Sequence, residues 1–101
     1  MEHIRIATYT INKGTFQELA ETAKTGMLPK FQQTPGFVRY GLADMGDRTV
    51  TSISVWETRE QAEAATPVAA TWVREHLADH VQLRSNTVGD LAFFAGVPAT
   101  V

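Results

Sequence analysis

The side chains best suited to chemistry gather on one predicted helix, over residues 67 to about 81. Trp72, His76 and His80 share one side of this helix with apolar residues, because positions four apart lie on one helical face. A histidine on an apolar stripe can serve as a general base when its surroundings hold its pKa near the working pH. We therefore expect Trp72 and His76 to be catalytic, with a hydrogen-bonded histidine at the edge of the core as the alternative.

The spacing of His76 and His80 would also suit half of a metal site. A zinc site needs three or four ligands, and His3 is the only other histidine in a chain that has no cysteine. We expect no metal, and we interpret His80 as a side chain stabilised by the negative end of its helix.

Further polar candidates lie on predicted strands, where every second residue faces the same way. Small hydroxyl side chains leave room under a helix, and an arginine beside them can hold a carboxylate or a phenolate. Alternatively, the arginine reaches water at the end of the sheet, and the tryptophans serve only the core. The residues expected to bind a substrate are Arg5, Tyr9, Ser52, Ser54 and Trp56.

The first half of the chain supplies the elements that position these residues. Residues 3–11 are rich in Ile, Thr and Tyr and read as a strand. Thr15 and Glu18 then form a capping box that opens a helix, whose apolar positions run from Phe16 to Phe31. Gly26 and Pro29 interrupt that pattern, and a break or kink is expected there because proline removes a hydrogen-bond donor.

The second half repeats this logic after a turn at residues 35–36. Residues 37–44 and 49–57 read as two strands joined by a hairpin loop. A second capping box at Thr58 opens a short helix that Thr66 and Pro67 end, and another helix follows to about residue 81. Ser85 and Asn86 form a predicted break before a last strand at residues 88–95.

The resulting order, strand-helix-strand-strand-helix-strand, predicts an α+β, ferredoxin-like βαββαβ fold with a four-stranded antiparallel sheet. The 101 residues suit one domain, 1–101, that ends in a tail at 97–101. The net charge of −2 and the lack of a basic run argue against a nucleic-acid partner. No apolar run is long enough to span a membrane, and we expect a cytoplasmic protein.

Both faces of the predicted sheet carry apolar residues, although two helices can cover only one. Ile4 and Ile6 oppose Tyr9 on the first strand, and Phe37 is expected to oppose Tyr40 and other apolar residues on the second. An uncovered face of this kind exceeds what monomers usually expose. The simplest cover is the same face of a second copy, so we expect a homodimer with its two sheets packed face to face.

Two segments give the chain a resemblance to a known family. They are residues 35–38, P-G-F-V, and residues 52–62, S-I-S-V-W-E-T-R-E-Q-A. Together with the tryptophan-bearing helix that follows, they resemble the antibiotic biosynthesis monooxygenase family. The resemblance covers about residues 3–96 and implies a dimeric α+β barrel.

The resemblance also implies a function: a monooxygenase without a cofactor that acts on a small aromatic or quinol-like molecule bound between helices and sheet. Family members use Trp, Tyr, Asn and Arg in that cavity, and this chain offers Trp72, Tyr9 and Arg5. The alternatives are a non-catalytic small-molecule binder and a structural barrel of unknown role.

A haem-degrading branch of the family is less well matched. Its asparagine and tryptophan positions fall on Ala7 and near Ala65, and only its histidine finds a counterpart, His76, after a shift of one residue.

The expected dimer gives the first testable prediction. Light scattering at micromolar concentration should return a particle with twice the mass of one chain, because burial of the second sheet face stabilises the pair. A particle with the mass of a single chain would contradict it.

Overall fold

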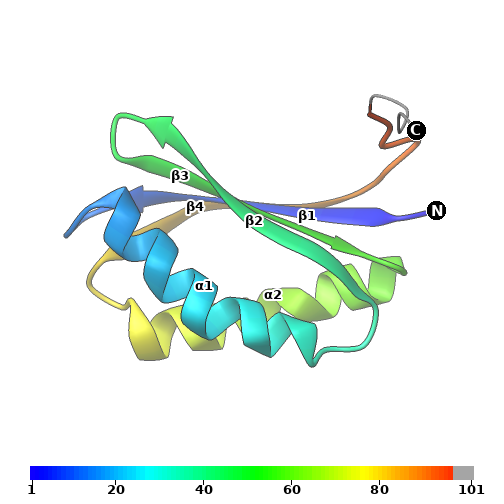
Figure 1. Ribbon diagram of the computed structural model, residues 1–101, viewed down its shortest axis with the longest axis horizontal. Helices are drawn as coiled ribbons and strands as arrows, with labels where there is room; N and C mark the ends of the chain where they lie inside the picture. The colour runs from blue at the N-terminus through cyan, green and yellow to red at the C-terminus, as the bar shows by residue number, and fades with distance from the viewer. Residues whose placement is uncertain (97–101) are drawn as a thin grey trace, which may run out of the picture.

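The structure of the protein is a computed structural model that describes residues 1–96; the predicted tail at 97–101 lies outside the described residues. The domain is α+β with the predicted order of elements (Figure 1). No described helix is both long enough and apolar enough to cross a membrane. The elements are β1 (His3–Ile11), α1 (Phe16–Gln32), β2 (Phe37–Gly46), β3 (Thr49–Trp56), α2 (Arg59–His76) and β4 (Val81–Asp90).

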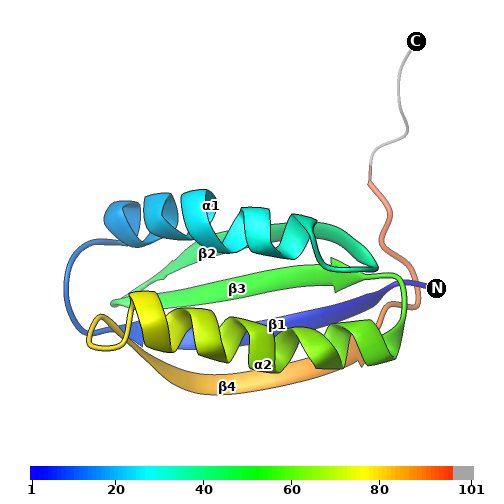
Figure 2. The same ribbon diagram turned by 90° about the horizontal axis from the view of Figure 1, so that it is seen from below.

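The four strands form one antiparallel sheet in the order β2-β3-β1-β4. Both helices lie on the same face of this sheet, and the opposite face carries no helix (Figure 1). Seen from the helical side, α1 runs along β2 while α2 runs over β1 and β4 (Figure 2). The predicted ferredoxin-like fold is therefore confirmed.

The first helix begins where the capping box predicts. The Thr15 hydroxyl accepts a hydrogen bond from the Glu18 backbone N–H at 3.2 Å, and the Glu18 carboxylate accepts one from the Thr15 N–H at 2.9 Å. Of the predicted break or kink at Gly26 and Pro29, the break is wrong, because α1 continues to Gln32. Pro29 is exposed and removes a single backbone donor near the helix end, while buried Met27 and Phe31 hold the helix against the sheet on either side of it.

The second helix is one element and not the predicted pair. Its capping box forms at Thr58, but α2 then continues through Pro67 to His76. Its buried positions, Ala62, Ala65, Ala69 and Trp72, keep one helical face toward the core on both sides of the proline. Packing of that face outweighs the hydrogen bond lost at Pro67.

The last strand lies earlier than predicted, at Val81–Asp90 and not at residues 88–95. Ser85 and Asn86 are no break, since they pair with Thr8 and Ala7 of β1. Most of β4 is exposed and polar, because it is an edge strand with one face uncovered. Strand patterns based on apolar residues miss a strand of this kind.

A β-bulge in β2 changes which of its side chains face the helices. The register with β3 shifts between Phe37 and Arg39, so Phe37, Tyr40 and Leu42 all pack against the core. The expectation that Phe37 opposes Tyr40 is therefore wrong. The extra residue at the bulge restores Phe37 to the covered face and moves apolar surface off the open one.

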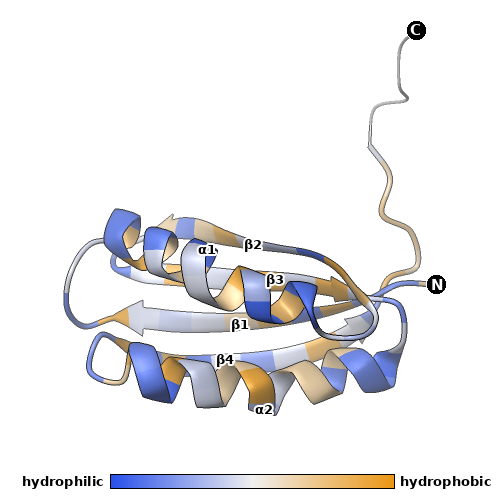
Figure 3. Ribbon diagram, turned by 60° about the horizontal axis from the view of Figure 1, so that its bottom comes forward, coloured by the Kyte–Doolittle hydropathy of each residue, from blue (hydrophilic) through white to orange (hydrophobic). Residues whose placement is uncertain are grey.

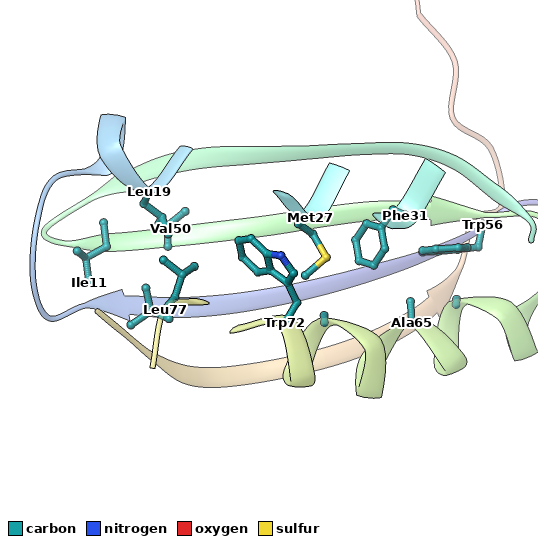
Figure 4. Close-up of a cluster of buried hydrophobic side chains, with 12 residues drawn as sticks. Ile11, Leu19, Met27, Phe31, Val50, Trp56, Ala65, Trp72 and Leu77 are labelled. Atoms are coloured by element: carbon teal, nitrogen blue, oxygen red, sulfur yellow. The ribbon is translucent and has the colours of Figure 1, made fainter. Parts of the chain in front are cut away.

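Aromatic side chains fill the core between the helices and the sheet (Figure 4). The Phe31 ring meets the Tyr40 and Trp56 rings edge to face, with centroids 5.2 and 5.3 Å away. Trp72 reaches from α2 toward α1, where it faces Gly26 (Figure 4). A methyl group added at Gly26 would lie 2.5 Å from the Trp72 ring, so this glycine sets how closely the helices approach.

That contact yields a stability prediction. Gly26→Ala should lower the free energy of unfolding by about 1–2 kcal/mol, because the clash with the buried indole exceeds the gain of about 1 kcal/mol in helix propensity. Urea denaturation measures the change. Exposed Thr25→Ala, one residue earlier, is the matched control and should shift stability by no more than about 0.5 kcal/mol. An unchanged or raised stability in Gly26→Ala would contradict the packing role.

Candidate functional site

A small cavity, here called the inner cavity, lies between the helices and the sheet. Its volume is about 30 Å³, which holds one or two water molecules but no aromatic ring. Tyr9, Tyr40, Ser52 and Trp72 are its polar-tipped lining residues. The other lining residues are apolar: Leu19, Ala23, Met27, Phe31, Leu42, Val50, Ala69, Val73, Leu77 and Val81.

The hydroxyl groups of this cavity come from three neighbouring strands. Tyr9 is on β1, Tyr40 is on β2, and Ser52 lies between them on β3. Burial raises the pKa of Tyr40 to about 12, although its hydrogen bond with Ser52 and the positive charge of Arg5 act in the opposite direction. The Tyr40 phenol is therefore protonated at neutral pH and available as a hydrogen-bond donor.

A second hollow, here called the outer cleft, lies between α2 and the strands β1 and β4. Its volume is about 270 Å³. Tyr9 and Val73 line both hollows and so form the partition between them. The remaining lining residues of the outer cleft are Arg5, Thr66, Ala70, Arg74, Ala78 and Leu83.

Arg5 lies at the inner wall of this cleft and is only 2% exposed. It does not reach water at the end of the sheet, because it sits within β1 between Ser54 on β3 and Val88 on β4. Its Nε donates a hydrogen bond to the Thr66 hydroxyl on α2 at 3.1 Å. The structure thus brings Arg5 and Tyr9 together at the outer cleft.

The expected catalytic pair divides between two places. Trp72 is buried and lines the inner cavity, whereas His76 is exposed and lines another hollow, of about 210 Å³, with His80 and Lys13. The two rings still stack, with centroids 4.9 Å apart and planes inclined by 31°. His76 can therefore influence the inner cavity through the Trp72 ring.

Ser54 and Trp56 line none of these three hollows. Both are fully buried, and the Trp56 indole donates a hydrogen bond to the Ser54 hydroxyl at 2.9 Å. This bond satisfies both polar groups inside the core. The structure gives the pair a place in the framework beneath the site, away from the space open to a ligand.

Tyr40 is the residue that sequence reasoning missed. In the sequence pattern it is one of the apolar positions of its strand, yet in the structure it supplies a hydroxyl to the inner cavity. Buried tyrosines usually find a partner for that hydroxyl. The nearby serines on the paired strand were the available signal, since Tyr40 pairs with Ser54 in register and bonds to Ser52.

The sequence matches a known protein family. A family model described as "Antibiotic biosynthesis monooxygenase" matches residues 3–67. The chain belongs to the antibiotic biosynthesis monooxygenase family. No curated protein matches the sequence.

Solved structures agree with this family membership at the level of the fold. One is a variant of SnoaB, a cofactor-independent oxygenase from Streptomyces nogalater, at 20% identity and TM-score 0.70, covering 92% of this chain and 95% of that one. MupZ from Pseudomonas fluorescens has 14% identity and TM-score 0.67, covering 86% and 69%. An uncharacterized NIPSNAP-like domain protein from Burkholderia xenovorans has 14% identity and TM-score 0.64, covering 96% and 91%.

The burial of Tyr40 predicts a titration. Between pH 10 and about pH 12 the unfolded chain loses a phenol proton that the folded chain keeps, so stability falls as the pH rises, by roughly 2–3 kcal/mol in total. Ultraviolet absorbance should show one tyrosine ionising near pH 12, or with unfolding. Tyr40→Phe should remove that step, whereas Tyr9→Phe should retain it. Complete ionisation of both tyrosines near pH 10 in the folded protein would contradict the assignment.

Proposed function

We propose that this protein is a cofactor-independent monooxygenase acting on a small aromatic or quinol-like molecule held between α2 and the sheet. Family membership supports the reaction class. The observation that carries the proposal is the arrangement of hydroxyl groups from Tyr9, Tyr40 and Ser52 around an otherwise apolar cavity walled by Trp72. An apolar lining with a few hydroxyl groups suits an aromatic ring that must react away from bulk water, once the space is enlarged to admit it.

The proposed reaction starts from an electron-rich phenol or its keto tautomer. Loss of a proton gives an anion that reacts with molecular oxygen. The ring is oxidised to a quinone: one oxygen atom replaces a ring C–H hydrogen and becomes a C=O group, and the other leaves as water with that hydrogen and the phenolic one, so the ring supplies the four electrons that oxygen accepts. Hydrogen bonds aimed at the negative oxygen lower the barrier most when they are already in place. The protonated Tyr40 phenol and the Ser52 hydroxyl are the donors that this cavity offers.

The aromatic ring of the proposed substrate reaches the Tyr40 and Ser52 hydroxyls only if the partition formed by Tyr9 and Val73 moves. The inner cavity is about 30 Å³ and the outer cleft about 270 Å³, so the substrate first occupies the outer cleft. Rotation of the Tyr9 side chain, which borders both hollows, would join them. Trp72 then forms the far wall, and His76 acts through its stacked contact with Trp72 as a positioning residue.

A second candidate function is a non-catalytic binder that uses only the outer cleft. The small inner cavity favours it, because a closed partition would keep any ligand away from Tyr40 and Ser52. Binding without oxygen consumption would distinguish this candidate from the first.

We also propose that two copies pair through the open face of the sheet. The centre of that face is apolar, with Ile4 paired to Val55 and Ile6 paired to Ile53; Val55 is already buried, but Ile6 remains 37% exposed. No helix covers it (Figure 1). Phe94 is 60% exposed and lies 6.0 Å from Arg39 at the edge of the same face. A second copy would remove this apolar surface from water.

Oxygen uptake tests the proposed reaction. With a panel of anthrones and hydroquinones, the purified protein should consume oxygen faster than the uncatalysed autoxidation, and Tyr40→Phe should lower kcat by about tenfold or more through loss of a donor to the anion. Circular dichroism checks that the variant is folded. No uptake above background with any member of the panel would overturn the oxygenase function.

The role of His76 is tested in the same assay with a matched neighbour. His76→Ala should lower kcat while the dimer persists, because the Trp72 ring loses its stacked partner. His80→Ala removes an exposed histidine from the same hollow and should leave kcat unchanged. Equal effects of the two substitutions would show that His76 has no special role.

A further inference from the structure

Arg5 is a buried cation that has no counter-charge among residues 1–96. The ion pairs of residues 1–96 join His3 to Asp90 and Arg59 to both Glu63 and Asp90, and none involves Arg5. Neither does any acidic residue line the outer cleft within the part of the chain that the structure describes. A guanidinium keeps its charge at any physiological pH, so the fold carries this charge at 2% exposure.

The guanidinium also has hydrogen bonds to give. It carries five N–H donors, and its one hydrogen bond among the described residues is the Nε bond to Thr66. The Thr66 hydroxyl accepts a second bond, from the Asn86 side chain at 3.3 Å, and this holds it as an acceptor. No side-chain nitrogen of the described residues is both sealed and unbonded, so the free end of Arg5 opens into the outer cleft.

Burying an ion without a partner costs stability, and proteins normally retain buried charges that are paired. The partner of Arg5 is therefore an anion that is not among residues 1–96. The planar guanidinium matches a carboxylate through two parallel hydrogen bonds. We propose that the outer cleft binds the carboxylate of a small aromatic acid, held by Arg5.

The rest of the cleft fits such a ligand. Tyr9, Val73 and Leu83 supply apolar surface for a ring, and Arg74 adds a second positive charge to the lining. The volume of about 270 Å³ exceeds the roughly 150 Å³ of a cavity that holds benzene, so a single ring fits. The volume of the outer cleft, its positive charge and its apolar lining together favour a carboxylic acid with a single aromatic ring as the ligand.

This inference deepens the proposed function, on which it rests for the identity of the site. A carboxylate at Arg5 would place the attached ring against Tyr9, at the partition to the inner cavity. The substrate class then narrows to hydroxylated aromatic acids. Binding can be measured without turnover, so the two proposals can fail separately.

The first experiment compares two probes on the unmodified protein by isothermal titration calorimetry under nitrogen. 2,5-Dihydroxybenzoate should bind more tightly than 2,5-dihydroxybenzamide by on the order of 10- to 100-fold, because only the acid offers an ionised partner to Arg5. Equal affinities, or no binding of the acid, would overturn the carboxylate site.

The second experiment separates a binding role from a structural one. Arg5→Met should abolish the preference for the acid and leave the midpoint of urea denaturation unchanged or raised, because it removes a buried charge that has no partner. Lys24→Gln removes a positive charge from the exposed side of α1 and should leave the preference intact. A lowered midpoint together with a retained preference would show that Arg5 is structural.

Arg5→Lys covers the case in which Arg5→Met fails to fold. It retains the charge but loses the two-pronged geometry, so the preference for the acid should fall without disappearing. An undiminished preference would overturn the role of the guanidinium. Acid binding without oxygen uptake on either probe or on any member of the panel would leave the carboxylate site standing and remove the oxygenase function. Uptake with the amide and no preference for the acid would do the reverse.

Discussion

The contact between the Trp72 indole and the backbone of α1 at Gly26 is the constraint on which the site depends. It fixes the approach of the two helices above the sheet, because any side chain at Gly26 would meet the ring at 2.5 Å. The space left beneath is the inner cavity of about 30 Å³. The Trp72 ring also forms a wall of that cavity and stacks on His76. The packing of Trp72 against Gly26 therefore sets the volume of the cavity, the position of its wall and the stacked contact with the exposed histidine. Polar and apolar stretches alternate along the ribbons of both helices (Figure 3), and the buried residues of each helix recur at helical spacing.

The sheet face that the helices cover contains buried polar residues that lower stability and are available for function. A face packed under helices would be most stable with apolar residues alone, yet it holds Arg5, Ser52 and Ser54 at 6% exposure or less. The Ser54 hydroxyl is used within the fold, since it accepts the Trp56 hydrogen bond. Arg5 has one hydrogen bond and no counter-ion among the described residues, and Ser52 faces the cavity. Buried polar groups that do not stabilise the fold are typical of a binding site.

Much of the fold was predictable because its signals are local. Both capping boxes form at Thr15 and Thr58, since a hydroxyl and a side chain three residues later satisfy the free backbone groups of one helical turn. Predictions failed where distant packing overrode a local rule. Pro29 and Pro67 lie inside continuous helices whose buried faces hold them against the sheet, and a bulge near Phe37 reverses the expected side of that residue. The polar strand β4 forms because its backbone pairs with β1 through a ladder of hydrogen bonds. The hydropathy of β4 by itself does not predict a strand.

By itself, the sequence determined the order of the elements, the caps of the helices, the sides of β1 and β3 that face the core, and the family. These follow from the types of neighbouring residues and from the period of side-chain directions, which is about two residues in a strand and about 3.6 in a helix. Only the tertiary structure decided which of the candidate residues meet. It separated His76 from the inner cavity, placed Ser54 and Trp56 in the framework and brought Tyr40 to the site. It also left Arg5 facing a cleft with no counter-charge among the described residues. Such meetings depend on strand register, on a single bulge and on the distance between two helices, which residues far apart in the chain set jointly.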